Sequence, residues 1–154
     1  MRIPTAAFRL LREAARHLLR RPVIGIAAAA RTADGRWLLI RRGDTGDWAL
    51  PGGTLEWGET LRESIEREIR EETGARVQSL GALSGVYSAP HRDPRFHAVT
   101  VVVRAQVSEP LGPPMNSLEI RDVGLFADDA LPDPIGMGMA DMIRDARSGT
   151  VQWE

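Results

Sequence analysis

The feature that most constrains this chain is a carboxylate-rich helical stretch at residues 53–75, GTLEWGETLRESIEREIREETGA. On a helical wheel of about 100° per residue, with Glu68 placed at zero, Glu72 lies near 40°. Both acids therefore lie over or beside the face that a folded domain would bury, where like charges repel and burial increases their cost. A positive group must compensate them, and a hard divalent cation is the obvious candidate. The apolar stripe of the same helix consists of Leu61, Ile65 and Ile69.

The composition is that of an ordinary globular domain. The chain has 154 residues, of which 43% are hydrophobic and 27% charged, and its formal net charge is −1. This length suits one domain with a substantial core, and the balanced charge indicates neither a nucleic-acid nor a membrane partner. No apolar run approaches the ~20 residues that cross a bilayer. The chain has no cysteine, which excludes disulfides and thiolate metal sites and agrees with a cytoplasmic location.

An amphipathic helix is predicted within residues 1–21, as an addition to the main domain at residues 22–154. Apolar residues recur there at helical spacing, and arginines form the remaining face. We interpret it as a helix that packs either on the domain or on a second subunit. In the second case the protein would be a homodimer. The alternative is a contact between its arginines and an anionic surface.

The rest of the sequence alternates strand and helix patterns. The central helix begins with a capping box formed by Thr60 and Glu63 and ends at Gly74, which tolerates a left-handed conformation. A further helix is expected at about residues 138–148. Strands interleaved with helices predict an α/β fold with a mixed sheet covered on two sides. These strands are expected at residues 23–31, 36–42, 54–56, 75–87, 96–107 and 119–126.

The carboxylate-rich stretch also matches a known signature. Gly53, five residues, Glu59, seven residues and then residues 67–74 resemble the Nudix box, Gly-x5-Glu-x7-Arg-Glu-U-x-Glu-Glu-x-Gly-U, where U is a bulky aliphatic residue. Every fixed position matches, and only the final aliphatic position differs, being Ala75. The resemblance extends over about residues 22–147. It implies a Nudix-type α/β/α sandwich that hydrolyses a nucleoside diphosphate linked to another moiety.

The resemblance also implies metal ligands. Glu68, Glu71 and Glu72 would bind a divalent metal, usually Mg²⁺ and alternatively Mn²⁺, and the Gly52 carbonyl would often join them. The chemistry supports this set, because Mg²⁺ takes oxygen ligands and keeps several waters, so a few carboxylates and substrate phosphates suffice. Such a metal offsets phosphate charge and acidifies the attacking water. The alternative is a solvated acidic face.

Supporting and proton-transfer roles fall on other residues. By the resemblance, Arg67 would be structural, and its helical spacing to Glu63 and Glu71 suits it to hold both carboxylates. Glu59 would support the site without taking part in catalysis. Glu119, in the region before the last predicted strand, is our candidate general base, and a glutamate of the box is the alternative.

The candidate substrate contacts lie outside the box. Residues 87–97 are similar to the Arg-Asp-Pro-Arg-x-His stretch of Nudix members that act on ADP-ribose and related nucleotide sugars. Arg92 and Arg95 are candidate ligands for phosphate or ribose oxygens, and the alternative is a turn with solvated arginines. His97 is expected to be a packed strand residue and not a catalyst. Trp48 is a candidate for stacking on a base, or else belongs to the core.

Arg41 and its neighbour Arg42 are further candidates for binding phosphate. Three functions remain open from the sequence. The first, which we favour, is hydrolysis of ADP-ribose or another nucleoside diphosphate sugar. The second is hydrolysis of nucleoside triphosphates or of capped or dinucleoside polyphosphates. The third is a module that binds a nucleotide without hydrolysing it.

Overall fold

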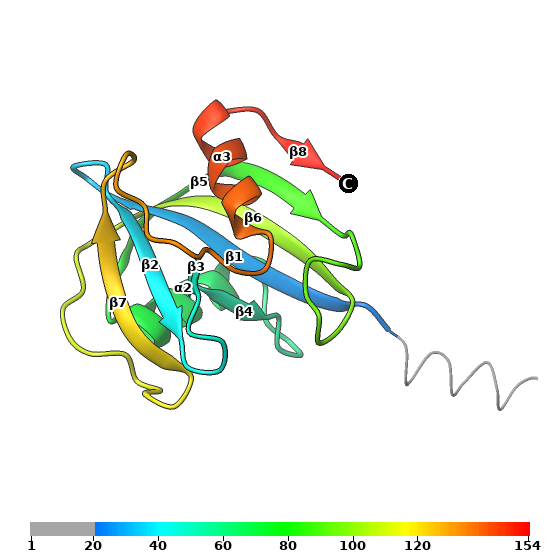
Figure 1. Ribbon diagram of the computed structural model, residues 1–154, viewed down its shortest axis with the longest axis horizontal. Helices are drawn as coiled ribbons and strands as arrows, with labels where there is room; N and C mark the ends of the chain where they lie inside the picture. The colour runs from blue at the N-terminus through cyan, green and yellow to red at the C-terminus, as the bar shows by residue number, and fades with distance from the viewer. Residues whose placement is uncertain (1–20) are drawn as a thin grey trace, which may run out of the picture.

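A mixed sheet of eight strands forms the centre of the molecule (Figure 1). The computed structural model describes residues 21–154, so the predicted N-terminal helix lies outside the described residues. The main path of the sheet is β3-β2-β1-β6-β5-β8, while β4 pairs with β1 and β7 pairs with β2. The elements are β1 (Val23–Thr32), β2 (Trp37–Arg42), β3 (Trp48–Ala49), β4 (Gly52–Thr54), α2 (Leu61–Thr73), β5 (Val77–Tyr87), β6 (Ala98–Val107), β7 (Ile120–Phe126), α3 (Met139–Ser148) and β8 (Gln152–Trp153).

Strand β1 lies in the interior of the sheet because nearly all its residues are small or apolar. Its sequence, VIGIAAAART, is continuously buried from Ile26 to Ala30. It runs parallel to β6 from Val23 opposite Ala98 to Thr32 opposite Val107, and antiparallel to β2 and β4. A strand that is apolar on both faces must be covered on both faces.

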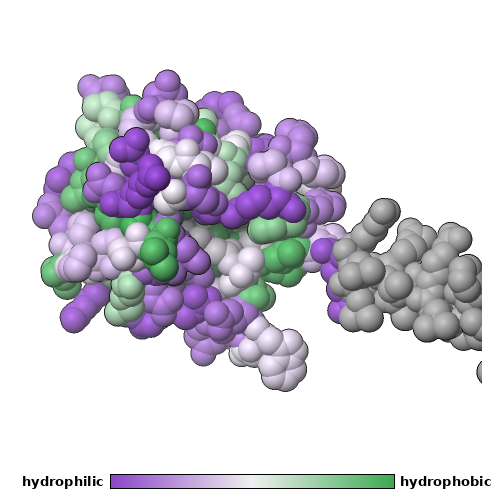
Figure 2. All heavy atoms as spheres, turned by 60° about the horizontal axis from the view of Figure 1, so that its bottom comes forward, coloured by the Kyte–Doolittle hydropathy of each residue, from purple (hydrophilic) through white to green (hydrophobic). Residues whose placement is uncertain are grey.

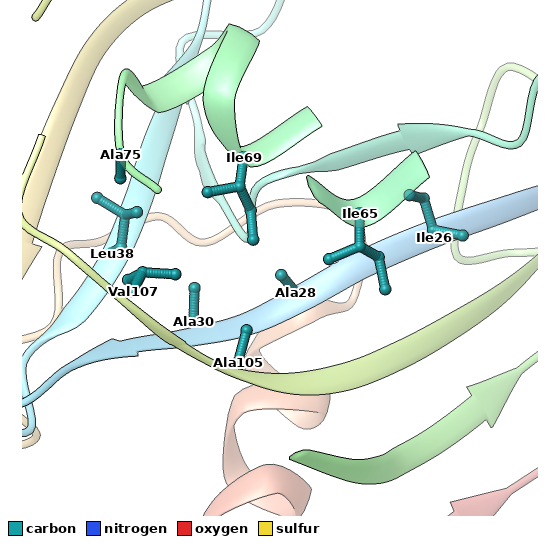
Figure 3. Packing of buried hydrophobic residues seen from close by; sticks show 9 residues of the cluster. All are labelled: Ile26, Ala28, Ala30, Leu38, Ile65, Ile69, Ala75, Ala105 and Val107. Atoms are coloured by element: carbon teal, nitrogen blue, oxygen red, sulfur yellow. The ribbon is translucent and has the colours of Figure 1, made fainter. Parts of the chain in front are cut away.

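The two helices cover opposite faces of β1, since successive residues of a strand point to opposite sides. Ile65 and Ile69 of α2 pack on one face, where Figure 3 shows the cluster between helix and sheet. Met142 and Ile143 of α3 pack on the other face. The predicted α/β/α arrangement is therefore confirmed. The alternating residues of β1 are Ile26, Ala28 and Ala30 towards α2, and Ala27 and Ala29 towards α3.

The ends of α2 follow the predicted caps. The Thr60 hydroxyl accepts a hydrogen bond from the Glu63 N–H, and the Glu63 carboxylate accepts one from the Thr60 N–H at 2.8 Å. Gly74 ends the helix with a φ of 68°. Leu61 differs from its predicted place in the apolar stripe. It is the first residue of α2, lies outside the packed cluster and is 38% exposed.

The predicted strands differ from the observed bounds by one or two residues, and two short strands, β3 and β8, are additions. The strand predicted at 54–56 lies earlier, as β4, because Gly52 pairs with Ala27 of β1. Strand β8 was not predicted, since two residues carry no periodic signal, and it runs parallel to the end of β5. Hydrophilic side chains cover most of the face seen in Figure 2, with hydrophobic ones in small separate areas. None of the helices within residues 21–154 has the length and apolar character needed to cross a bilayer.

Candidate active site

Two glycines of β4 let the carboxylates of α2 approach the sheet. A Cβ atom on Gly52 would lie 2.1 Å from the backbone oxygen of Ile26. A Cβ atom on Gly53 would lie 2.3 Å from Oε1 of Glu68. At Gly52 the clash is with backbone, so only hydrogen fits there, whereas a methyl group at Gly53 would force the Glu68 carboxylate to move. The first glycine of the box is therefore needed for the position of one of the box carboxylates.

Glu72 is a buried carboxylate, only 9% exposed. Its Oε2 atom accepts a hydrogen bond from the Gly52 N–H at 2.8 Å. The pKa of Glu72 is raised to about 8, chiefly by burial; the hydrogen bond from Gly52 opposes this shift and the neighbouring Glu68 adds to it. Burial also raises the pKa of Glu68, although the Arg67 guanidinium opposes the shift. The wheel correctly placed these two acids beside the buried face, where their charge is poorly compensated.

Arg67 anchors the exposed side of the acidic cluster. Its Nε and Nη2 atoms donate to the two oxygens of Glu59 at 2.7 and 3.0 Å, and its Nη1 donates to Glu68 at 2.9 Å. Nη1 also lies 3.6 Å from Glu71. The hydrogen bonds from Arg67 lower the pKa of Glu59 to about 2. The expected contact between Arg67 and Glu63 is wrong, because the Glu63 carboxylate is used in the capping box.

An open cavity of about 340 Å³ lies at this junction of α2, β4 and the neighbouring loops. We call it the acidic cavity. Its polar lining includes Glu68, Glu72 and Glu119, with Arg42 and Arg95 as cationic groups. The predicted site residues that line it are Gly52, Glu68, Glu72, Arg95 and Glu119. Those that do not line it are Arg41, Trp48, Glu71 and Arg92.

The two arginines that line the cavity donate hydrogen bonds to neighbouring aspartates. Arg42 donates from Nε and Nη2 to Asp44 at 2.9 and 2.7 Å. Arg95 donates from the same two atoms to the buried Asp93 at 3.0 and 2.8 Å, and its Nη1 lies 3.6 Å from Asp44. Arg42 is close enough to Glu72 to lower that carboxyl's pKa, which opposes the effect of burial. A single cavity thus holds carboxylates, one of them buried, together with oriented guanidinium groups.

Arg41 and Trp48 lie elsewhere. Arg41 is exposed and donates from Nε to the Gly46 carbonyl at 3.0 Å. The pairing of β2 with β7 shifts register between Arg41 and Arg42, and Arg42 lines the cavity. Trp48 packs edge-to-face on Phe126, with 4.8 Å between ring centroids, and joins the core beneath α3.

Arg92 ties the 87–97 region to the end of the chain. Its guanidinium binds the Glu154 carboxylate and donates to the Gly138 carbonyl at 3.1 Å. It also lies over the Tyr87 ring, 4.9 Å from the centroid. These contacts make Arg92 a structural link between β5, α3 and β8. His97 is exposed in the structure, with Nε2 2.8 Å from the Ser88 carbonyl oxygen, so its predicted packing in a strand is wrong.

The fit of a metal rests on the two cavity carboxylates. Glu71 points to the flank, where its oxygens lie 3.6 Å from Arg67 and 3.5 Å from Arg70. In the described part of the chain, no three His, Cys, Asp or Glu side chains converge as a complete ligand group. However, Glu68 and Glu72 supply hard oxygen donors, and their raised pKa reflects charge that a cation would stabilise. This donor set fits a divalent ion whose remaining ligands are water and substrate oxygens.

The comparisons with known proteins identify the family of the chain. The sequence model for the NUDIX domain matches residues 20–146. The chain is 36% identical over 126 residues to a MutT-like protein of Streptomyces ambofaciens, a match that covers 82% of this chain and 77% of that protein. It is 49% identical over 72 residues to an ADP-ribose pyrophosphatase of Methanocaldococcus jannaschii, covering 45% of this chain and 42% of that protein.

A solved structure extends the comparison to the fold. The crystal structure of a MutT NUDIX hydrolase from Burkholderia pseudomallei superposes with a TM-score of 0.71 at 31% identity. The match covers 82% of this chain and 98% of that one. The chain therefore belongs to the Nudix family, whose hydrolases generally use a divalent metal.

Proposed function

We propose that the chain is a metal-dependent pyrophosphohydrolase that acts on ADP-ribose or another nucleoside diphosphate sugar. One observation carries the proposal: the half-buried carboxylate of Glu68 and the buried carboxylate of Glu72 share a cavity with Arg42 and Arg95. A diphosphate needs cationic groups for binding and oxygen ligands that hold a metal next to it. The name of the M. jannaschii relative supports ADP-ribose as the substrate, although the match spans less than half of that protein.

In this proposal, Glu68 and Glu72 hold the metal, preferably Mg²⁺ with Mn²⁺ as an alternative. The Gly52 carbonyl and Glu71 are additional proposed ligands, and Glu71 would have to leave Arg67 and Arg70 to take part. When bound, the metal would offset phosphate charge and acidify a water molecule. Arg67 keeps the Glu68 side chain in place through its Nη1 donor.

The chain's own residues would guide the hydrolysis. Arg42 and Arg95 hold the diphosphate, and the acids that fix their guanidinium planes reduce the entropy lost on binding. Water attacks one phosphorus atom and the bridging P–O bond breaks, so ADP-ribose yields AMP and ribose 5-phosphate. Glu119, exposed at the cavity, is the proposed acceptor of the proton from water.

The second candidate is hydrolysis of nucleoside triphosphates or dinucleoside polyphosphates. The specific observation in its favour is a relative from Enterobacter sp. that is named a nucleoside triphosphatase and is 58% identical over 33 residues, which cover 21% of this chain. The same carboxylates and arginines would serve this reaction. The products differ, because a triphosphate would yield a monophosphate and pyrophosphate.

The test is a panel of ADP-ribose, other nucleoside diphosphate sugars, nucleoside triphosphates and dinucleoside polyphosphates, incubated with Mg²⁺ and followed by ³¹P NMR. AMP and ribose 5-phosphate from ADP-ribose support the proposal. A monophosphate with pyrophosphate supports the second candidate. Binding without turnover of any compound identifies a non-catalytic module and overturns the proposal.

Three proposals accompany this function. The chain comprises an amphipathic helix at residues 1–21 and a Nudix domain at 22–154, and the family match from residue 20 is compatible with that division. The helix is proposed to mediate a homodimer, which light scattering of the full chain would test. A cytoplasmic location is supported by the absence of cysteine from the sequence.

A further inference from the structure

A second cavity, of about 270 Å³, lies on the α3 face of the sheet. We call it the distal pocket and define it by Ala29, Arg31, Trp37, Arg104, Gln106 and Ala146. It shares no lining residue with the acidic cavity. Met139 of α3 lines the acidic cavity, and Ala146 of the same helix lines the distal pocket. These two residues are seven positions apart, which is about 10 Å along the helix axis. The distal pocket is therefore a separate site.

The register of the sheet brings the polar residues of the distal pocket together. In the parallel pair β1·β6, Arg31 lies opposite Gln106 and Ala29 lies opposite Arg104. Alternate residues of a strand share a face, so Arg104 and Gln106 project to the same side of β6. Ser79 of β5 pairs with Gln106 and adds a hydroxyl to the lining.

Arg104 carries an unused hydrogen-bonding capacity at this pocket. Its Nε donates to the Ala146 carbonyl at 3.2 Å, whereas its Nη2 atom is buried and has no hydrogen-bond partner. Among residues 21–154, no carboxylate lies within ion-pairing distance of its guanidinium. The guanidinium of Arg104 thus has no ion-pair partner, and its charge is available to an anion in the pocket that it lines, although Nη2 itself is enclosed by protein atoms.

The charges around the pocket favour an anion. The Asp128 carboxylate forms ion pairs with Arg31 at 2.7 Å and with Arg147 at 2.9 Å. These two guanidinium groups lie 4.8 and 5.8 Å from the centroid of the Trp37 ring. The lining of the distal pocket itself includes two guanidinium groups, those of Arg31 and Arg104, and no Asp or Glu among the described residues, so the pocket carries excess positive charge.

We propose that the distal pocket binds a small organic oxyanion, either a phosphate monoester or a carboxylate, with its charged group at Arg104. Guanidinium groups bind both kinds of oxyanion through paired N–H donors. The walls formed by Ala29 and Ala146 are apolar and would contact the organic part of the ligand. Inorganic phosphate fills only a part of this volume and would bind more weakly.

The test is NMR of the ¹⁵N-labelled full chain in EDTA, titrated with phenyl phosphate, benzoate and inorganic phosphate up to about 10 mM. We expect phenyl phosphate or benzoate to shift the amide signals of Gly81, Ala105 and Gln106 in a saturable manner, more strongly than inorganic phosphate. The organic ligand that binds tighter identifies the oxyanion class. No saturable shift with either organic probe, or shifts confined to the residues of the acidic cavity, would overturn the proposal.

Variants connect binding to the pocket. Arg104→Met should weaken binding by at least about tenfold, because it removes the charged donor. Gln106→Glu is a second variant at an exposed position and should weaken binding similarly by charge repulsion. Gln78→Glu is the matched control: it makes the same change at an exposed position of β5 outside the pocket, and should leave binding unchanged. Equal affinity in Gln106→Glu and Gln78→Glu would contradict the assignment.

Discussion

Replacing Glu72 by Gln should make the metal-free protein more stable at pH 8, because it removes a buried charge. Burial raises the pKa of Glu72 to about 8 in the folded chain, from an ordinary value of 4.5. Below pH 4.5 both the folded and unfolded states bind the proton, so the shift has no effect. As the pH rises towards 8, the unfolded state releases this proton freely while the folded state retains it, so stability is progressively lost.

The size of this loss follows from the shift. At pH 8 it amounts to about 4 kcal/mol, and at pH 5 to less than about 1 kcal/mol. This is a large share of a typical free energy of unfolding of about 5–15 kcal/mol. Gln has nearly the same shape as Glu, and its amide oxygen can still accept the hydrogen bond from the Gly52 N–H.

Denaturant unfolding in EDTA at about pH 5 and pH 8 measures the effect. Glu72→Gln should exceed the wild type by up to about 4 kcal/mol at the higher pH, with the difference nearly absent at the lower pH. Glu66→Gln is the matched control, because Glu66 is an exposed glutamate of the same helix. If Glu72→Gln is no more stable than the wild type at pH 8, the buried charge is already compensated and our reasoning is wrong.

Two further predictions concern the cavity. Gly53→Ala should lower Mg²⁺-dependent turnover by at least about tenfold, because the new methyl group displaces the Glu68 carboxylate. Gly112→Ala is the control and should leave turnover unchanged, because a Cβ atom at Gly112 meets nothing within 4 Å. Arg95→Ala should raise KM by about tenfold or more, with a smaller change in kcat. Arg92→Ala should instead lower mainly the denaturant midpoint of unfolding, because Arg92 contacts the start of α3 and the end of the chain. A larger KM effect from Arg92 than from Arg95 would reverse their assignments. Steady-state kinetics and denaturant unfolding measure these outcomes.

Local sequence patterns predicted the parts of the fold that depend on local interactions. The capping box of Thr60 and Glu63 and the stop at Gly74 each involve residues within one turn of the helix. The place of Glu72 beside the buried face followed from helical periodicity alone. The wheel failed for Leu61, because periodicity gives the direction of a side chain without showing how far the sheet extends beneath it.

Long-range contacts decided the residues that the sequence could not place. Arg92 is held by Glu154 and Gly138, which are 62 and 46 positions away in the chain. The register shift opposite β7 separates Arg42 from Arg41, and no property of two adjacent arginines indicates such a shift. Asp44 and Asp93 orient Arg42 and Arg95 from only two positions away, and it is the 3.6 Å approach of Arg95 to Asp44 that depends on loops brought together by the sheet.

The most direct test of the account is the Mg²⁺ dependence of turnover in the wild type, Glu72→Gln and Glu66→Gln. With saturating ADP-ribose, we predict that turnover of the wild type and of Glu66→Gln rises with Mg²⁺ and is abolished by EDTA. Glu72→Gln should be at least about a hundredfold slower at every Mg²⁺ concentration. Turnover by Glu72→Gln at the wild-type rate would contradict the claim that Glu68 and Glu72 of α2 form the metal-dependent active site.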